Sequence, residues 1–342
     1  STVTYNISIY NEGDKAGKAT ETVKGPITVV QKVTGITLSQ TSASINLGNT
    51  LTLVATVTPT TANNTGVIWS SSNTAVARVS TSGVVTGVKA GSATITATAK
   101  DGSGKKATCT VTVKHPSIST TTSYVGYYAD IDGDTNPDGI IYADLAFSVS
   151  GEWGRSKKTF SYSATTGTKD YYVSRKNYEG KFGKKDVITA QGSGEDRFYV
   201  MALDDFNTGT EYCWYYAAFE QISHYSTVTS TSFGKGRTNT STMITKWNNE
   251  EYGEQNDYYS PYSPSYHDMW GAIQDKVAEG WFVPSKEEWV AFGCNLAITI
   301  DNYVDYGLDS DYWSSSLDSK IDAWVPHYGS ECMDLSTINS NE

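Results

Sequence analysis

Apolar and polar residues alternate in several short segments of this chain, and a period of two residues indicates half-buried β-strands. The alternation is regular over residues 51–57, 93–99 and 108–113. Pro59 follows the first run, and polar turns separate the others. Because short strands at this spacing are typical of antiparallel sandwiches, we predict a mainly β sandwich over residues 35–114.

The other domain boundaries follow from weaker patterns. In residues 1–34, apolar residues occupy every second position of 3–9, and a second strand-like run covers 26–30. Two or three strands do not bury a core by themselves, so this segment is either the end of a preceding domain or an extension that packs on the sandwich. A Pro/Ser/Thr-rich linker is expected over 115–123, which leaves 124–342 as a second domain.

Two segments near the C-terminal end have the spacing of amphipathic helices. The first covers 267–277 and ends before Gly280, and the second follows Ser285. Ser285 and Glu288 form a capping box, in which Ser285 caps the Glu288 N–H and Glu288 reaches back. The apolar faces consist of Met269 or Trp270, Ile273 and Val277 in the first helix, and of Trp289, Phe292 and Leu296 in the second.

The rest of the second domain shows fewer regular patterns. Strand-like runs cover 139–147 and 197–203. Residues 165–194 are polar and rich in Lys and Gly, and are predicted to form a long loop or insertion. Residues 210–218 fit a strand or a helix.

The 342-residue chain has a formal net charge of −11. Nucleic acids and anionic membrane surfaces attract basic stripes, so this balance argues against both as partners. No apolar run is long enough to cross a bilayer. The abundance of Thr, Ser, Gly and Tyr suits strands and turns, and it also suits surfaces that recognise other molecules.

Four cysteines are present, at Cys109, Cys213, Cys294 and Cys332. They form no CxxC pair and are too few for a disulfide framework in a chain of this length. We expect small buried side chains or free thiols, and Cys213 with Cys294 is the one bridge that merits a test.

An acidic loop follows the predicted linker. Its alternating carboxylates and amide could converge on a hard cation such as Ca²⁺, and the Gly139 that follows fits the sharp turn of an EF-hand-type loop. Leu145 stands where a bidentate carboxylate is needed, and Asp and Asn also build metal-free turns. Both interpretations stay open. The candidate calcium ligands are Asp130, Asp132, Asp134, Asn136 and Asp138.

The sandwich segment also resembles a known domain. The stretches Val67–Val79, Gly83–Val88 and Gly91–Ala97 look like the bacterial immunoglobulin-like group 2 domain. This resemblance implies an immunoglobulin-like sandwich with Trp69 in its core. It also implies a spacer or adhesive module of a bacterial surface protein or a phage tail protein.

The C-terminal part resembles the C-type-lectin fold of the formylglycine-generating-enzyme-like branch. The residues that carry this likeness are 281–289, Tyr312–Ser316 and Ala323–Trp324. More narrowly, the region is similar to the variable proteins of diversity-generating retroelements in gut bacteria and their phages. The resemblance implies an α+β C-type-lectin fold over 124–342, following the mainly β immunoglobulin-like sandwich.

In that family a reverse transcriptase rewrites adenine positions in the last coding stretch, and a fixed skeleton supports the altered side chains. The resemblance implies a scaffold of Tyr312, Trp313, Ser314, Ser315, Ala323, Trp324, Tyr328 and Met333. It implies displayed, ligand-binding positions at Asp318, Ser319, Ile321, Asp322, Val325, His327, Ser330, Cys332, Asp334, Leu335, Ser336 and Thr337. Lys320 and Glu331 are expected on the same surface, beside these positions.

Formylglycine-generating enzymes use reactive cysteines and copper. Neither Cys294 nor Cys332 has a His within a motif to activate it. His224, His267 and His327 are isolated and lack metal-ligand spacing. We therefore predict no catalytic residue and no required cofactor, and retain an enzyme of this type as a remote alternative.

The sequence thus predicts a non-enzymatic recognition protein on a virion surface, such as a phage tail, or on a bacterial cell surface. Its partner is expected to be a host-cell surface protein or glycan, and a homo-oligomer is a further candidate. The alternative is an adhesin or lectin that binds glycan through a fixed aromatic site. No EPN or QPD triplet occurs for calcium-bridged sugar binding, but the Tyr-rich loop 258–266 is a candidate border of the displayed surface.

Overall fold

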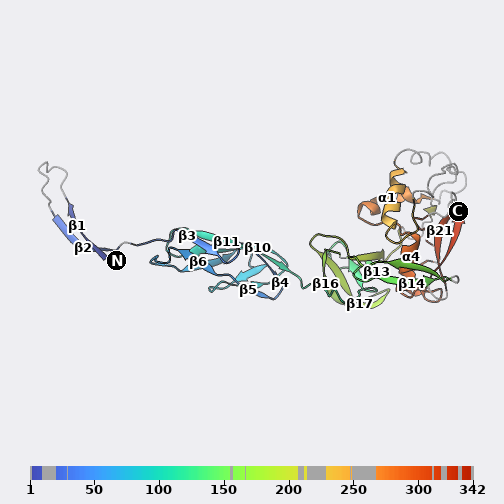
Figure 1. Ribbon diagram of the computed structural model, residues 1–342, viewed down its shortest axis with the longest axis horizontal. Helices are drawn as coiled ribbons and strands as arrows, with labels where there is room; N and C mark the ends of the chain where they lie inside the picture. The colour runs from blue at the N-terminus through green and yellow to red at the C-terminus, as the bar shows by residue number, and fades with distance from the viewer. Residues whose placement is uncertain are drawn as a thin grey trace. The chain divides into compact units, whose positions relative to one another are not determined.

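The computed structural model describes most of the chain, and the chain divides between Pro116 and Ser117 into two compact units (Figure 1). We call Ser1–Pro116 unit 1 and Ser117–Glu342 unit 2. The described residues are 2–9, 21–28, 30–154, 157–165, 167–206, 212–213, 229–246, 248, 267–309, 312–316, 322–329 and 333–339. For 2–9, 21–28, 212–213, 267–268, 322, 326 and 333–339 the description covers the backbone alone. No helix among these residues has the length and apolar character to cross a membrane.

Unit 1 begins with an antiparallel hairpin of β1 (Thr2–Ile9) and β2 (Glu21–Thr28). The first strand is where the alternation predicts it, whereas the second begins earlier than expected. Within the described residues this hairpin forms a two-stranded sheet of its own.

The remainder of unit 1 is a sandwich of short strands, as the alternation predicts. One sheet has the order β4-β11-β10-β7, and the facing strands form β3-β6 and β5-β9-β8. The strands are β3 (Gly35–Leu38), β4 (Ser42–Asn46), β5 (Thr50–Thr52), β6 (Ala55–Thr58), β7 (Val67–Ser71), β8 (Ala77–Val79), β9 (Val84–Gly87), β10 (Gly91–Ala99) and β11 (Lys106–Lys114). Trp69 packs against both apolar clusters of the sandwich, which agrees with its expected place in the core.

The predicted strand at 51–57 is two strands, so that prediction was wrong in detail. β5 pairs with β9, and β6 pairs with β3 on the other side. Between them Leu53 is buried and donates its N–H to the Gly83 carbonyl, while Val54 is 58% exposed. The chain changes partners at this point, and alternation alone does not reveal such a switch.

Unit 2 is built on a five-stranded sheet of order β16-β17-β12-β13-β18. Neighbouring strands run antiparallel except β12 and β17, which are parallel. The strands are β12 (Tyr128–Asp130), β13 (Gly139–Asp144), β16 (Asp170–Gly180), β17 (Gly183–Gln191) and β18 (Phe198–Ala202). One face packs against helix α4 (Lys286–Asn295) and the hairpin of β14 (Val149–Trp153) and β15 (Lys158–Tyr162), and the other face packs against the segment before β12.

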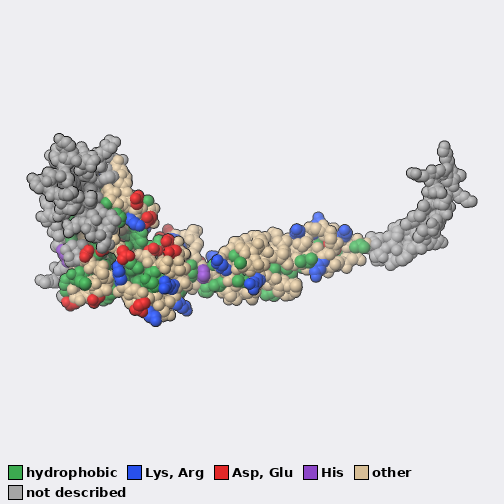
Figure 2. Space-filling view, turned by 180° about the vertical axis from the view of Figure 1, so that it is seen from behind, with side chains coloured by type: hydrophobic (Ala, Val, Ile, Leu, Met, Phe, Trp, Pro, Cys, Tyr) green, Lys and Arg blue, Asp and Glu red, His purple; other side chains and the backbone are tan. Residues whose placement is uncertain are grey.

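Hairpin β16–β17 corrects the prediction of a long loop over 165–194. Tyr171, Val187 and Ile188 are buried on this hairpin, but Lys and Gly residues surround them and hide the strand pattern. Two irregularities of register on β16 break the period of two further. Lys and Arg side chains gather at the end of unit 2 that carries these strands (Figure 2).

The predicted helix at 267–277 is interrupted. The chain forms β20 (His267–Asp268), α2 (Met269–Ala272) and α3 (Gln274–Ala278), and it ends before Gly280, which has a φ of +102°. β19 (Tyr212–Cys213) pairs with β20 in parallel. The other elements of unit 2 are α1 (Gly236–Lys246), the 3-10 helix η5 (Tyr303–Tyr306), β21 (Asp322–Tyr328) and β22 (Met333–Asn339).

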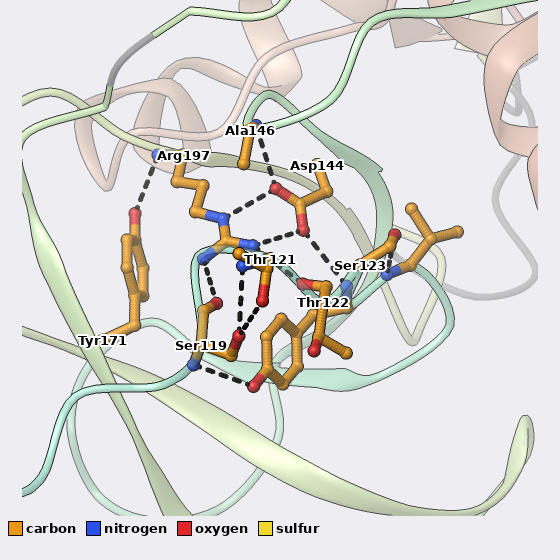
Figure 3. Close-up of polar contacts among 10 residues, drawn as sticks. Ser119, Thr121, Thr122, Ser123, Asp144, Ala146, Tyr171 and Arg197 are labelled. Carbon is orange, nitrogen blue, oxygen red and sulfur yellow. Dashed lines mark hydrogen bonds and ion pairs between the residues drawn. The ribbon is translucent and has the colours of Figure 1, made fainter.

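The second half of the expected linker is bound to unit 2 rather than free. Arg197 donates from Nε and Nη2 to the two carboxylate oxygens of Asp144, at 2.7 and 2.8 Å (Figure 3). Its Nη1 donates to the Ser119 carbonyl at 2.8 Å, and Nη2 donates to the Thr122 carbonyl at 3.0 Å. Both charged side chains are buried. A planar guanidinium can satisfy these acceptors together, and it thereby fixes the entry of the chain into unit 2.

Candidate functional site

Helix α4 packs against hairpin β21–β22 and serves as its platform. The capping box at its start is confirmed: the Glu288 N–H donates to Ser285 Oγ at 3.4 Å, and the Ser285 N–H donates to Glu288 Oε2 at 2.6 Å. Trp289 and Phe292 are buried, as the predicted apolar face requires, while Leu296 is half-buried.

Glu288 also holds the loop that precedes α1. Its carboxylate accepts the N–H groups of Gly234 at 3.0 Å and of Gly236 at 3.1 Å, in addition to that of Ser285. The side chain is fully buried, and this burial raises the pKa of the Glu288 carboxyl although the hydrogen bonds oppose the shift. The capping residue is therefore a junction between two helices as well as a local cap.

Three consecutive serines connect this platform to β21. The Ser314 N–H donates to the Trp324 carbonyl, and the Trp324 N–H donates to the Ser316 carbonyl, at 3.0 and 3.1 Å. Ser316 Oγ donates to the Ser230 carbonyl and accepts the N–H of Lys286. All three serines are buried, and their small hydroxyls fit where backbone segments approach closely and leave polar groups to be paired.

Stacked aromatic rings surround the same junction. Tyr312 stacks on Trp289 with a centroid distance of 4.9 Å, and Trp289 Nε1 donates to the Trp313 carbonyl. Tyr328 stacks on Tyr303, also at 4.9 Å. Burial raises the pKa values of the Tyr312 and Tyr328 hydroxyls, so both remain neutral at ordinary pH. These rings are thus partly or wholly interior.

Trp324 of β21 lies in a cluster of lysine and tryptophan side chains. Lys286 Nζ stands 3.3 Å from the centre of the Trp324 ring and 5.5 Å from that of Trp153. Lys158 Nζ stands 5.2 Å from the centre of Trp153. Cation–π contacts of this kind attach the start of α4 and hairpin β14–β15 to β21. Trp153 is only 5% exposed, so its ring is covered and is not available for stacking with a sugar.

Hairpin β21–β22 carries many of the positions expected to bind ligand. Its register pairs Val325 with Ser336 and His327 with Asp334. Val325 is 3% exposed, so its expected place on the displayed surface was wrong. His327 is half-buried.

The register also limits how β22 can present its residues. Asp334 and Ser336 lie on the same face of the hairpin as their register partners His327 and Val325. Leu335 and Thr337 lie on the other face, together with their register partners Pro326 and Trp324. Four consecutive strand residues cannot share one face, so the displayed positions 334–337 divide between two.

The remaining expected positions are only partly covered by the described residues. Asp318, Ser319, Lys320, Ile321, Ser330, Glu331 and Cys332 lie outside them. For Asp322, Met333, Asp334, Leu335, Ser336 and Thr337 the backbone is described, in β21 or β22. The Tyr-rich loop 258–266 and most of 210–218 also lie outside the described residues. The ligand-binding role of these residues stays a prediction.

The acidic loop brings together three of its five candidate calcium ligands. One carboxylate oxygen from each of Asp130, Asp132 and Asp138 lies within 4.8 Å of the other two. Asp130 already accepts hydrogen bonds from the Gly133 N–H, the Thr135 N–H and the Thr189 hydroxyl. These bonds account for a metal-free turn, while the carboxylate cluster has the chemistry of a calcium site.

The other two candidate ligands, Asp134 and Asn136, are hydrogen-bonded to each other. Asp134 accepts both the backbone and the side-chain N–H of Asn136, which lowers the pKa of the Asp134 carboxyl. Calcium binding by Asp130, Asp132, Asp134, Asn136 and Asp138 stays a prediction, and the structure gathers the carboxylates of Asp130, Asp132 and Asp138. A melting temperature unchanged by a chelator would contradict it.

The two cysteines whose side chains the structure describes differ from each other. Cys109 is free and buried, as expected, and burial raises the pKa of its thiol. Cys294 is disulfide-bonded, so it offers no thiol as a nucleophile. The structure describes only the backbone of Cys213, and Cys332 lies outside the described residues. A Cys213–Cys294 bridge therefore stays a prediction.

Sequence reasoning missed two features of unit 2. Glu288 was predicted as a cap but not as the anchor of the loop before α1, because Gly234 and Gly236 are distant in sequence. The Arg197–Asp144 pair was missed as well. The sequence did carry a signal for this pair. The strand-like runs 139–147 and 197–203 each contain one charged residue, and the two charges have opposite signs.

Comparison with known families identifies part of unit 1. Residues 32–111 match the family described as "Bacterial Ig-like domain (group 2)". The resemblance of the sandwich to this domain is therefore confirmed. The match leaves unit 2 unassigned.

Curated relatives share a segment of similar size. An uncharacterized protein of Clostridium acetobutylicum is 46% identical over 80 residues, which are 23% of this chain and 8% of that protein. A 3-O-alpha-D-galactosyl-alpha-L-arabinofuranosidase of Bifidobacterium longum is 43% identical over 101 residues, and these cover 27% of this chain and 9% of the enzyme. An Ig-like virion protein of Serratia phage KSP90 is 38% identical over 103 residues, or 30% of this chain and 38% of that protein. The chain thus spans less than half of the length of each.

Solved structures show only a distant likeness. Domains 4 and 5 of the S-layer protein SbsC are 25% identical, with a TM-score of 0.21, over 28% of this chain and 59% of that chain. Domains 5 and 6 of the same protein are 16% identical, with a TM-score of 0.22, over 47% of this chain and 99% of that chain. At these TM-scores the likeness supports no conclusion about unit 2.

Proposed function

We propose that this protein is a non-enzymatic recognition protein of a virion or bacterial cell surface. Unit 1 acts as a spacer or anchor, and unit 2 is a C-type-lectin-like domain whose C-terminal hairpin and flanking turns bind the ligand. In this proposal the chain is a variable protein of a diversity-generating retroelement, and its partner is a protein or glycan of a host cell.

The observation that carries the proposal is the attachment of β21 to a buried scaffold. The Ser314–Ser316 segment brackets Trp324 through two backbone hydrogen bonds, and Ser316 continues to α4 through the Lys286 N–H. The aromatic stacks beneath it are also buried in whole or in part. A hairpin held in this way can change its outer residues without loss of the core, which is the physical requirement for a diversified surface.

Two further observations support a surface location. The immunoglobulin-like unit has a relative named as an Ig-like virion protein. Cys294 is disulfide-bonded, and structural disulfides persist outside the reducing cytoplasm. The same bond disfavours the formylglycine-generating alternative, because a bridged sulfur cannot act as a free thiolate.

Exchange of displayed residues tests this function. A full-length variant with Asp318, Ser319 and Ser330 replaced by Tyr is compared with wild type for binding to a panel of gut bacterial cells by flow cytometry. We expect the set of bound cells to change while the melting temperature stays within a few degrees. The matched control replaces Thr52, Thr56 and Thr58 of unit 1, which are exposed, by Tyr. An unchanged set of cells, or an equal change in the control, would contradict the proposal.

A further inference from the structure

The tip of hairpin β16–β17 carries a concentration of positive charge in an acidic chain. Six Lys or Arg residues and only two acidic residues occur between Lys169 and Lys185, although the whole chain has a net charge of −11. Two of these six form ion pairs, Lys169 with Asp196 and Lys181 with Asp204. The other four have exposed side chains, and these side chains form no ion pair or hydrogen bond with the described residues. They are Arg175, Lys176, Lys184 and Lys185, which we call the basic tip.

Glu179 and Asp186, the acidic residues nearest in sequence to the basic tip, form no ion pair with it among the described residues. Asp186 accepts the Asn177 N–H at 2.9 Å, so one of its oxygens is engaged with the backbone. Glu179 lies opposite Lys184 in the register and forms no ion pair with it. A cluster of unpaired cations in water attracts counter-ions, and a ligand that replaces them gains free energy.

The hairpin that carries the basic tip is fixed to the interior of unit 2. The buried Tyr128 hydroxyl accepts the Phe182 N–H at 2.8 Å and donates to the Gly183 carbonyl at 3.0 Å. The Phe182 ring stacks on Tyr306 with a centroid distance of 4.8 Å. The turn is therefore held at its end by a hydrogen-bonded tyrosine and by a ring stack, so the charges stand on a rigid support.

Aromatic rings also orient two of the four charges. The Arg175 guanidinium lies 4.8 Å from the centre of the Tyr178 ring, and Lys185 Nζ lies 5.7 Å from that of Tyr127. Contacts of this kind restrict long side chains before a ligand arrives, which lowers the entropic cost of binding.

The spacing of the charges suggests an extended ligand. Lys184 and Lys185 are opposite Glu179 and Tyr178, and Arg175 and Lys176 lie further along β16 beyond a register shift. Strands rise about 3.3 Å per residue and lie about 4.8 Å apart, so the four charges extend over roughly 10 Å or more. One small anion cannot contact all of them, whereas a polymer with repeated anionic groups can. Arg also matches the oxygens of a phosphate with two parallel donors.

We propose that the basic tip binds a phosphate-bearing polymer of the cell envelope, as a second contact apart from hairpin β21–β22. The charge and its rigid support come from the structure, and the cell envelope as the source rests on the proposed function. Such a contact would not distinguish between cells that carry the polymer, and it would hold unit 2 near a cell while the displayed surface tests its own ligand.

Edge protection is the competing explanation for these residues. β16 is at the edge of the five-stranded sheet, and exposed charges with bulges discourage pairing between edge strands of different molecules. If the charges serve only this purpose, their removal will increase self-association and leave polymer binding unchanged. This outcome would overturn the proposal.

The test measures binding of the full chain to poly(glycerol phosphate) teichoic acid by calorimetry. The test variant carries Arg175, Lys176, Lys184 and Lys185 all changed to Gln. The matched control carries four exposed lysines of unit 1, Lys89, Lys100, Lys105 and Lys106, changed to Gln, so that both variants lose four positive charges. We expect affinity for teichoic acid to fall about tenfold or more in the test variant and to stay within about twofold in the control.

Three further arms make the result specific. The wild-type affinity should fall between about 50 mM and about 300 mM NaCl, and less steeply in the test variant. A variant with Lys176, Lys184 and Lys185 changed to Arg keeps the charge and should retain binding. Neutral dextran should not bind, and duplex DNA or alginate should bind more weakly than teichoic acid. Equal loss in both quadruple variants, or tighter binding of DNA or alginate, would overturn the proposal.

Failure of this proposal is distinguishable from failure of the proposed function. Loss of the basic tip should reduce binding to all cells that carry the polymer without changing which cells are preferred. Substitution of Asp318, Ser319 and Ser330 should change the preference and leave binding to isolated teichoic acid intact.

Discussion

Glu288 shows at the scale of one residue how a local motif acquires a wider role. The Ser285–Glu288 capping box was predictable, because both partners lie within four residues of each other and the pattern before an apolar run is specific. The bonds to Gly234 and Gly236 were not predictable, because they depend on how α1 and α4 meet. Three N–H groups converge on one buried carboxylate.

Replacement of Glu288 by Gln tests this junction. The Gln amide turns at least one donor towards an N–H group, so we expect a loss of about 2 kcal/mol in the free energy of unfolding, measured with urea. The control is Glu287→Gln, because the Glu287 side chain accepts only the Phe233 N–H within the described residues and should cost about 1 kcal/mol or less. Equal effects of the two substitutions would contradict a special role for Glu288.

The pH dependence of the same variant has a defined sign. Burial raises the folded-state pKa of Glu288 above its ordinary value of 4.5, so the native state binds the proton more readily than the unfolded state. Its contribution to stability is therefore complete below pH 4.5 and is lost as the pH rises through the folded-state pKa. The stability of wild type relative to the Gln variant should consequently increase as the pH is lowered from neutral.

Arg197 is a second residue whose role depends on distant partners. It joins Asp144 to carbonyl groups of the segment that enters unit 2. Arg197→Lys keeps the charge but loses the planar fork of donors, so Asp144 and at least one carbonyl lose their partner. We expect a cost of about 3 kcal/mol in the unfolding of unit 2, and faster amide hydrogen exchange near Ser119. Arg78→Lys, at an exposed position of unit 1, is the control and should have no effect.

At the scale of elements, accuracy of prediction followed the regularity of burial. β10 and β11 have one buried and one more exposed face and were predicted from alternation alone. β16 and β17 were predicted as a loop, because register shifts and exposed lysines interrupt their pattern. The helix at 267–277 was recognised but its interruption was not. The available signal was Gly271, a poor helix former two residues before the change at Ile273.

Hairpin β21–β22 provides a test at this scale. Val325 is buried and His327 is half-buried on the same face, although both were expected to be displayed. Val325→Asn places an amide in the interior and should lower the free energy of unfolding by about 2–3 kcal/mol, as measured in urea. His327→Asn should have a much smaller effect. If Val325→Asn melts like wild type and alters cell binding, then Val325 is a displayed residue and the register is different.

At the scale of the whole molecule, the two units were predictable to different degrees. Unit 1 contains a domain whose residues are specific enough that a resemblance seen in the sequence agrees with the family match to residues 32–111. For unit 2, the sequence supplied α4, its cap and several strands, but not the order of the sheet. That order joins β12 to β17 and β13 to β18 across long separations, which local patterns do not specify.

For the whole molecule, the proposed function is recognition by a diversified C-terminal surface. The structure contains a buried junction of Ser314–Ser316, α4 and β21. In the proposed function, the residues of this junction stay constant while the displayed residues vary. Trp313 and Trp324 belong to this expected scaffold. Position 325, which is buried, should behave as scaffold too.

The most direct test is to sequence the coding end of the gene and the neighbouring DNA from many independent isolates. We expect a near-copy of this coding end beside a reverse-transcriptase gene, differing from it mainly at adenines. We also expect codons 318, 319, 321, 322, 330, 332 and 334–337 to vary among isolates while those for Trp313, Trp324, Val325 and Met333 stay fixed. Absence of a second copy, with substitutions spread equally over scaffold and displayed codons, would contradict the proposed function.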